Sequence, residues 1–361
     1  MKRYEIAVVH GDGIGAEVCR PTVDVIRHAL PDAGRLDFVE YPAGADHYRR
    51  TGDAFPKESL EGCRRADAVL HGAAGLPGVT FPDGTEAGVE FGLKLRVSLD
   101  LYANVRAIRL RPGVVSPLRG VEAGGIDYLI VREGSEGLYA SNGAGAVVRD
   151  EVAVDMQVIT RKGAERVCRT AFELARDSGG ALADGRRRVT CCDKSNVLRS
   201  FGLFRRVFNE VAADFPDVAP DYSYADAMTV HLIQRPRFYN VIVAENFLGD
   251  ILSDLGAATV GGMGMSPSAE LGAGHGFFQA AHGSAPDIAG RNVANPYGTI
   301  LSGAWMLRWL GERHGDGMLQ AAGRRIDAAV DAALQSGVRT RDIGGNAATT
   351  EAAQAVIAAL G

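Results

Sequence analysis

Lysine, cysteine and long apolar runs are scarce in this chain. Only five of its 39 lysine and arginine residues are lysines, namely Lys2, Lys57, Lys94, Lys162 and Lys194. Arginine therefore fills the ordinary basic positions, and a lysine with apolar neighbours becomes a candidate for chemistry. The five cysteines are odd in number and lack the spacing of a disulfide framework or a zinc site. We expect the adjacent Cys191 and Cys192 to be small buried residues at a strand end.

Two further absences bear on location and partners. No stretch approaches the ~20 apolar residues of a transmembrane helix, and no signal peptide opens the chain. We therefore expect a cytoplasmic protein without a membrane partner. The net charge of −5 argues against a general nucleic-acid surface. A small anionic substrate remains compatible with this charge, because clustered arginines can form a local positive pocket.

The order of apolar segments and glycine-rich turns predicts an α/β fold. Residues 4–9 are typical of a strand buried on both faces, and a helix from about 16 to 30 follows the turn HGDGIG. The glycines of that turn, at 11, 13 and 15, lack the dinucleotide-binding spacing. We expect a tight turn near a ligand and not a true Rossmann fold.

The remaining pattern alternates in the same way. It predicts strands at 35–41, 67–71, near 222–226 and at 239–244, and in the segments LYANVRAIRL, IDYLIVRE and RRVTCCD. It predicts helices at 89–99, 161–178, 199–214, 297–313, 316–336 and 348–360, and a β-rich excursion near 140–160.

Two carboxylates in AENFLGDILSDLGAATVGGMG, residues 244–264, provide the most specific signal of chemistry. Asp250 and Asp254 are four positions apart at the start of an apolar helical pattern, so they share one face of a helix. Two such carboxylates repel each other unless a cation lies between them, and oxygen ligands suit Mg²⁺ or Mn²⁺. An acid pair is often only a solvated surface, but apolar neighbours such as Ile251 and Leu252 favour a metal site here.

Three arginines favour a substrate with two carboxylates. Arg96 is in a predicted helix, and Arg106 and Arg132 are in predicted strands with apolar flanks. An isolated arginine is usually a surface residue, but arginine also pairs with carboxylates through two hydrogen bonds. Near a metal site, the three would suit a dicarboxylic acid.

Lys194 and Tyr139 are candidates for proton transfer. Lys194 follows a strand end, where ligands bind in α/β folds, and nearby positive charge would help it act as a general base. Tyr139 could donate a proton, although a core or interface tyrosine fits the pattern equally well.

The segment HGSAPDIAGRNVANP, residues 282–296, is a candidate cofactor loop. Its small residues expose backbone N–H groups, and the helix that follows favours anions at its N-terminus. Asp287 could accept hydrogen bonds from ribose hydroxyls, as an acidic residue does in NAD sites.

These motifs together resemble the β-decarboxylating dehydrogenase family, which comprises isopropylmalate, isocitrate, homoisocitrate and tartrate/D-malate dehydrogenases. The match runs from HGDGIGAEV through LRVSLDLYANVRAIRL, VREGSEGLY, DKSNV, YADAM and ENFLGDILSDLGAATVGGMG to HGSAPDIAGRNVANP, which is essentially the whole chain. The resemblance implies a two-domain open α/β sandwich of the isopropylmalate dehydrogenase type. It places a cofactor-binding domain at 1–101 plus 261–361, and a dimerisation and substrate domain with the β-rich arm at 102–260.

The resemblance also implies residue roles. Arg96, Arg106 and Arg132 match the ligands of the substrate carboxylates, Tyr139 the catalytic acid and Lys194 the catalytic base. The implied metal ligands are Asp226, Asp250 and Asp254, and the implied cofactor ligands are His282, Gly283, Ser284, Ala285, Asp287 and Asn295. Lys194 and Asp226 would be donated across a homodimer interface, and Asp287 points to NAD over NADP.

The implied activity is oxidative decarboxylation of a D-malate-type acid that uses NAD and Mg²⁺ or Mn²⁺. Val89 and Leu93 would face the C3 substituent and favour an alkyl group, as in 3-isopropylmalate. Glu90 and Lys94 would suit a polar one, so tartrate, D-malate, isocitrate and homoisocitrate stay open, as does a non-catalytic regulatory paralogue. The chain departs from the family at Ala16, Ala107, Gly134 and Ser135. Gly134 lacks a side chain that often faces the active site, which leaves substrate contacts there open.

Overall fold

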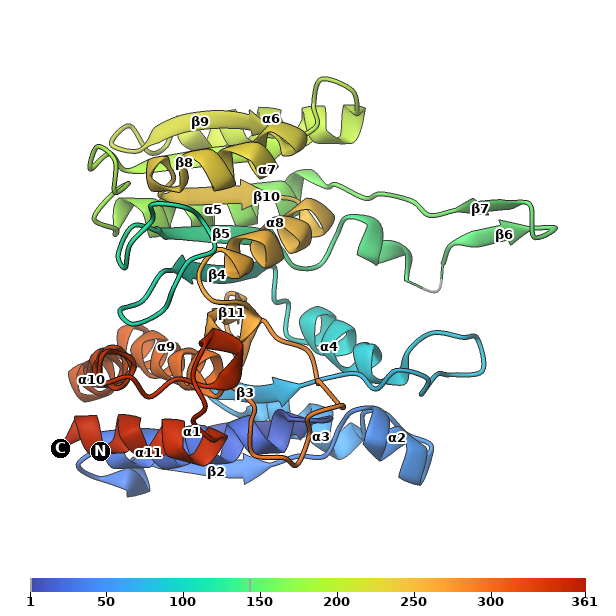
Figure 1. Cartoon of the computed structure of the whole chain (residues 1–361). Coiled ribbons are helices and arrows are strands. Elements are labelled where there is room, and N and C mark those ends of the chain that lie inside the picture. The colour runs from blue at the N-terminus through green and yellow to red at the C-terminus, as the bar shows by residue number, and fades with distance from the viewer. Residues whose placement is uncertain (1, 143) are drawn as a thin grey trace. The chain divides into compact units, whose positions relative to one another are not determined.

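The chain divides into two compact units. The structure is a computed structural model that describes residues 2–142 and 144–361 (Figure 1). Unit 1 consists of Met1–Leu101, Arg111–Val115 and Gly261–Gly361, and unit 2 of Tyr102–Leu110 and Ser116–Val260. Unit 1 is therefore assembled from both ends of the sequence, whereas nearly all of unit 2 is one continuous segment.

Unit 1 contains five strands and the helices that cover them. The strand order is β2 (Leu36–Glu40), β1 (Tyr4–Gly11), β3 (Ala68–Ala73), β12 (Gly276–Ala280) and β11 (Pro267–Leu271). Neighbours are parallel except β11 and β12. Its helices are α1 (Gly15–Ala29), α2 (Ala45–Thr51), α3 (Lys57–Arg65), α4 (Ala87–Ser98), α9 (Tyr297–His314), α10 (Gly317–Gln335) and α11 (Thr349–Leu360).

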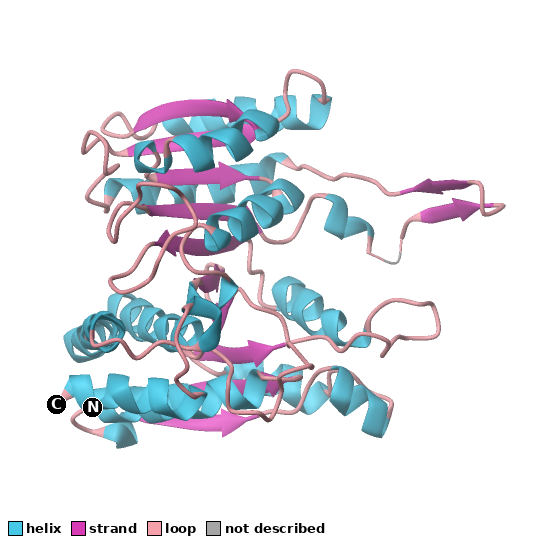
Figure 2. Ribbon diagram, viewed as in Figure 1, coloured by secondary structure: helices cyan, strands magenta, loops and turns pink. Residues whose placement is uncertain are grey.

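Unit 2 repeats this architecture with a second set of strands. The order is β4 (Ala103–Arg109), β5 (Asp127–Glu133), β10 (Val241–Ala244), β8 (Arg188–Asp193) and β9 (Ala219–Tyr224), parallel except for β4 against β5. Helices α5 (Arg161–Arg176) and α6 (Arg199–Ala212) cover one face, and α7 (Ala225–Gln234) and α8 (Asn246–Ala258) cover the other (Figure 2).

Most elements predicted from the sequence are present, and the α/β fold is confirmed. Helices α2, α3 and α7 and strands β11 and β12 were not predicted. Each of these elements is ten residues or shorter, so intrinsic preference is weak and packing against neighbours contributes strongly to its conformation. Cys191 and Cys192 are fully buried at the end of β8, as expected.

The excursion near 140–160 is less regular than the sequence suggested. It forms the short 3₁₀ helix Leu138–Ser141 and a hairpin of β6 (Ala146–Val148) and β7 (Val152–Val154) that extends away from the rest of unit 2 (Figure 1). Gly143, within the predicted range, lies outside the described residues. The hairpin leaves four valines exposed, namely Val147, Val148, Val152 and Val154.

The core of unit 1 joins α3 and α4 to the sheet. Cys63 on α3 and Phe91 on α4 pack against Val69 on β3 and Phe277 on β12, within a cluster that extends to β1. No helix among residues 2–142 and 144–361 has both the length and the apolar character needed to span a membrane.

The turn HGDGIG is held against the loop that begins at His282. The amide of Ile14 donates to the carbonyl of Ser284 at 2.8 Å, and the Ser284 hydroxyl contacts the carbonyl of Gly75. Gly13 has a φ of +54°, and a Cβ there would lie 2.0 Å from the Ser284 carbonyl oxygen. Only glycine meets both constraints, so the turn fixes the position of this loop.

Replacing Gly13 by alanine should destabilise the protein by about 2 kcal/mol, because the added methyl group meets backbone at a positive φ. Urea denaturation measures the change. Gly202→Ala is the matched control, since its Cβ would meet only the Arg206 side chain at 3.8 Å, within helix α6. Equal stabilities of the two variants would contradict this account of the turn.

A buried histidine should make stability depend on pH. His71 on β3 is 1% exposed, its Nδ1 lies 2.7 Å from the Val9 carbonyl oxygen, and its ring packs against Phe91 and Phe277. Burial lowers the pKa of His71 from 6.5 to about 4. The unfolded chain therefore binds a proton that the folded chain excludes, and stability falls as pH drops from 6.5 towards 4.

The lost stability amounts to about 3 kcal/mol for a shift of this size. His71→Gln should remove this part of the pH dependence of the free energy of unfolding, measured by urea denaturation between pH 4.5 and 7. The exposed His28 provides the control, and His28→Gln should leave the slope unchanged. A wild-type slope retained in His71→Gln would show that another group is responsible.

Candidate active site

Helix α8 presents the two carboxylates predicted as metal ligands. The helix begins after Glu245, whose buried side chain accepts hydrogen bonds from the amides of Phe247 at 3.1 Å and Leu248 at 2.8 Å. These bonds satisfy N–H groups that have no partner within the helix. Asp250 and Asp254 lie one turn apart on the helix that Glu245 starts.

Close packing against β5 decides where the Asp250 carboxylate lies. A Cβ at Gly249 would be 2.7 Å from the Cβ of Arg132, so only glycine lets the first turn of α8 approach the strand this closely. Helix α8 and strand β5 thereby bring Asp250 and Arg132 together, although these residues are far apart in the sequence.

Two buried arginines and a tyrosine surround the carboxylate pair. Arg132 Nη1 contacts Asp250 Oδ1, and its Nε donates to Asn246 Oδ1 at 2.8 Å. Arg106 Nη1 lies 3.1 Å from Asp254 Oδ1, and its Nη2 lies 3.6 Å from Asp250 Oδ1. The Tyr139 hydroxyl donates to Asp250 Oδ2 at 2.8 Å. Five of the residues singled out from the sequence therefore form one cluster.

The electrostatics of this cluster fit a cation site. Burial raises the pKa of Asp254, and the neighbouring Asp250 raises it further, while Arg106 opposes the change. In the single chain Arg106 and Arg132 supply positive charge beside the two acids. Carboxylate oxygens at this spacing are suitable ligands for a hard divalent ion.

Lys194 and Asp226 form a second cluster. Lys194 follows β8, Asp226 is in the first turn of α7, and Nζ lies 2.6 Å from Asp226 Oδ1. The hydrogen bond from Lys194 lowers the pKa of Asp226. Among the described residues of this single chain, no three His, Cys, Asp or Glu side chains gather as a metal site. Asp226 therefore does not join Asp250 and Asp254 within one chain.

The other predicted site residues are in unit 1. On α4, Val89 is exposed, Leu93 is half-buried, and Lys94 forms an ion pair with Glu90. Arg96, on the same helix, pairs with the buried Glu270 of β11.

The loop at 282–296 has both fixed and exposed positions. Ser284 is buried, whereas Gly283 and Asp287 are exposed and His282 and Ala285 are half-buried. Asn295 Nδ2 donates to Asp342 at 2.9 Å, and its Oδ1 accepts from the Tyr297 amide at 2.9 Å. The Glu17 carboxylate accepts a hydrogen bond from the Gly290 amide at 2.9 Å. The loop is thus tied to α1 and to the start of α9, with the Asp287 carboxylate in solvent.

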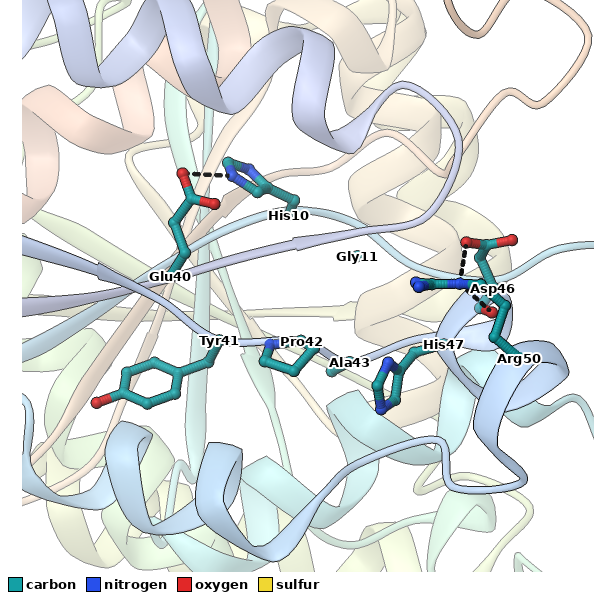
Figure 3. Close-up of a pocket in the computed structure, with 9 residues that line it drawn as sticks. All are labelled: His10, Gly11, Glu40, Tyr41, Pro42, Ala43, Asp46, His47 and Arg50. Carbon is teal, nitrogen blue, oxygen red and sulfur yellow. Dashed lines mark hydrogen bonds and ion pairs between the residues drawn. The ribbon is translucent and has the colours of Figure 1, made fainter.

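A cavity of about 340 Å³ lies elsewhere in unit 1, where β1 and β2 end (Figure 3). His10 Nε2 lies 3.1 Å from Glu40 Oε1, and Arg50 Nε lies 3.1 Å from Asp46 Oδ2 on its walls. None of the site residues predicted from the sequence lines this cavity.

Sequence reasoning missed three residues that support the site. Glu245 starts α8, Asn246 holds Arg132, and Glu270 holds Arg96. The acid at 245 directly before the apolar pattern was a readable helix-start signal. No local signal marked Glu270, because its partner is far away in the sequence.

The comparisons with known proteins identify the family of this chain. The model of the family described as isocitrate/isopropylmalate dehydrogenase matches residues 5–356. A protein named 3-isopropylmalate/3-methylmalate dehydrogenase from Methanocaldococcus jannaschii is 42% identical, over 98% of this chain and 98% of that protein.

Two solved structures share the fold. Isocitrate dehydrogenase from Methylococcus capsulatus has a TM-score of 0.85 and 31% identity, with 99% of each chain covered. A β-decarboxylating dehydrogenase from Thermococcus kodakarensis has a TM-score of 0.77 and 39% identity, over 99% of this chain and 96% of that one. The chain belongs to the isocitrate/isopropylmalate dehydrogenase family and is an oxidoreductase of the β-decarboxylating type. The family resemblance seen in the sequence is therefore confirmed.

Proposed function

We propose that this protein catalyses the NAD-dependent oxidative decarboxylation of a 3-alkylmalate of the D-malate type, with 3-isopropylmalate as the reference substrate. The observation that carries the proposal is the cluster in unit 2. It combines two carboxylates, two arginines and a tyrosine within hydrogen-bonding or ion-pair distance. Such a set suits an acidic substrate bound beside a divalent cation.

Asp250 and Asp254 would hold Mg²⁺ or Mn²⁺, together with Asp226 of a second subunit. A bound divalent cation would stabilise negative charge on the oxygen at C2, and NAD⁺ would accept the hydride from C2. The loop at 282–296 would bind the cofactor, and the exposed Asp287 carboxylate suits ribose hydroxyls and repels a 2′-phosphate.

The protein's own residues would bind the substrate and move two protons. Arg96, Arg106 and Arg132 would orient the substrate through its carboxylates. Lys194 would accept the proton of the C2 hydroxyl as hydride leaves C2. After the C3–CO₂ bond breaks, Tyr139 would donate a proton to C3. Before substrate binds, the ion pair with the Asp226 carboxylate holds the Lys194 amine in place.

Exposed apolar residues support a homodimer with shared sites. Val230 and Ile233 on α7 and Phe247 and Ile251 on α8 are all exposed in the single chain. Exposed apolar side chains on two helices that contact each other are typical of an interface between subunits. We propose that this face and the β6–β7 hairpin contact a second copy, and that Lys194 and Asp226 act in the partner's site.

An ion pair on α4 favours an alkyl substituent at C3. Lys94 could bind a third carboxylate, as in an isocitrate-type acid, but it pairs with Glu90 one turn away. Val89 and Leu93 provide apolar surface on the same helix. The isocitrate dehydrogenase among the related structures makes this acid the alternative substrate to test.

A panel of acids tests the substrate. With Mn²⁺ and NAD⁺, 3-isopropylmalate should give the highest kcat/KM, at least ten-fold above isocitrate, homoisocitrate, tartrate and D-malate. The measurement is NADH formation at 340 nm. A preference for isocitrate would mean that the α4 segment binds a polar substituent at C3 of the substrate. No turnover of any acid would favour a non-catalytic regulatory paralogue.

Lys194→Ala tests the base. Turnover should fall by about 100-fold or more, because general-base assistance is lost, while the protein still folds and dimerises. The exposed Lys162 on α5 is the control, and Lys162→Ala should retain wild-type turnover. Near-normal turnover of Lys194→Ala would exclude the lysine as the base.

A further inference from the structure

One of the three proposed substrate arginines is held by a carboxylate buried in the core of unit 1. Arg96 Nε lies 2.7 Å from Glu270 Oε2, and Nη2 lies 2.8 Å from Glu270 Oε1. Glu270 is 1% exposed on β11, and the Arg96 side chain is 15% exposed on α4. This bidentate pair fixes the plane of the guanidinium as well as its position.

A second strand holds the carboxylate in place. Gln279 on β12 donates through Nε2 to Glu270 Oε1 at 3.0 Å. The backbone carbonyl of Gln279 accepts a hydrogen bond from the Ser302 hydroxyl on α9 at 2.6 Å. The chain of bonds therefore runs from α9 through β12 and β11 to the tip of the Arg96 side chain.

The geometry of the pair leaves a definite direction for the arginine. Glu270 engages the edge formed by Nε and Nη2. A substrate carboxylate that binds Arg96 would therefore meet a guanidinium whose torsional freedom is already lost. Preorganisation of this kind lowers the entropic cost of binding.

We propose that Glu270 is the positioning residue for Arg96, and that it sets the affinity for the carboxylate which Arg96 binds. The inference rests on the proposed function, in which Arg96 binds substrate. Glu270 itself does not touch the substrate, and it acts only through the arginine.

Arg111 in unit 1 forms ion pairs with two aspartates outside the proposed site and provides a comparison. Arg111 Nη1 lies 2.8 Å from Asp327 Oδ1 and 2.7 Å from Asp331 Oδ1, and the Arg111 side chain is 5% exposed. None of these three residues belongs to the proposed site. Loss of one acid here should change stability and leave the KM values unchanged.

A double-mutant cycle tests the proposal on the full-length protein. Glu270→Gln keeps the shape of the side chain but removes the charge and one acceptor. It should raise KM for the malate-type substrate about ten-fold, with KM for NAD⁺ and kcat changed less than two-fold. Arg96→Lys should raise KM further, and adding Glu270→Gln to it should have no additional effect.

Three outcomes would overturn the proposal. The first is a lowered substrate KM in Glu270→Gln, which would mean that Glu270 competes with the substrate for Arg96. The second is a double variant whose rise in KM is the product of the rises in the two single variants. The third is an equal rise of KM in the control Asp331→Asn. Wild-type activity is measured first. If the wild-type protein turns over none of the acids, both the proposed function and this inference are wrong. If it is active but the effects of the two substitutions on KM multiply, only this inference is wrong.

A second variant covers poor folding of Glu270→Gln. Gln279→Met removes the donor to Glu270 but keeps the carboxylate and the volume. It should raise the substrate KM two- to five-fold in the Arg96 protein and leave it unchanged in Arg96→Lys. An effect that persists in the Arg96→Lys background would contradict a role exerted through the arginine.

Discussion

The close contact between the first turn of α8 and β5 is the constraint on which the site depends. Because Gly249 has no side chain, the helix approaches Arg132 closely enough for the arginine to reach Asp250. The same helix then carries Asp254 to Arg106 one turn later. The charges in this cluster are nearly balanced, since two arginines face two aspartates. The arginines are the buried members of the cluster, and the aspartates supply the negative charge that a buried arginine needs.

The sequence alone singled out five residues of unit 2 that lie in one cluster, because the signals that mark most of them are local. Asp250 and Asp254 are on one helix, and Lys194 follows a strand directly. Spacing along a helix and position at a strand end are visible in the sequence and fix which side chains can meet. The α/β fold was readable for the same reason, from the alternation of apolar strands with amphipathic helices.

Contacts between distant segments were not readable. Glu270 and Gln279 carry no motif, and β11 and β12, on which they lie, were not predicted at all. Both strands are only five residues long, and pairing with neighbouring strands of unit 1 stabilises them. A buried carboxylate opposite an arginine from another element becomes evident only when the packing is known. The β-rich excursion near 140–160 was readable because its valines favour strands, and the structure has the β6–β7 hairpin there.

The way in which unit 1 draws on both ends of the chain has a consequence for biosynthesis. Unit 2 has every one of its strands once residue 244 has left the ribosome, and its last helix ends at Ala258. Unit 1 needs β11 and β12 beside β3, and these strands are made only after residue 266. Until those segments are made, the first hundred residues lack β12 beside β3 and helices α9 and α11 against α1. Domains usually fold in the order of their synthesis, but here the middle of the chain can finish before the beginning.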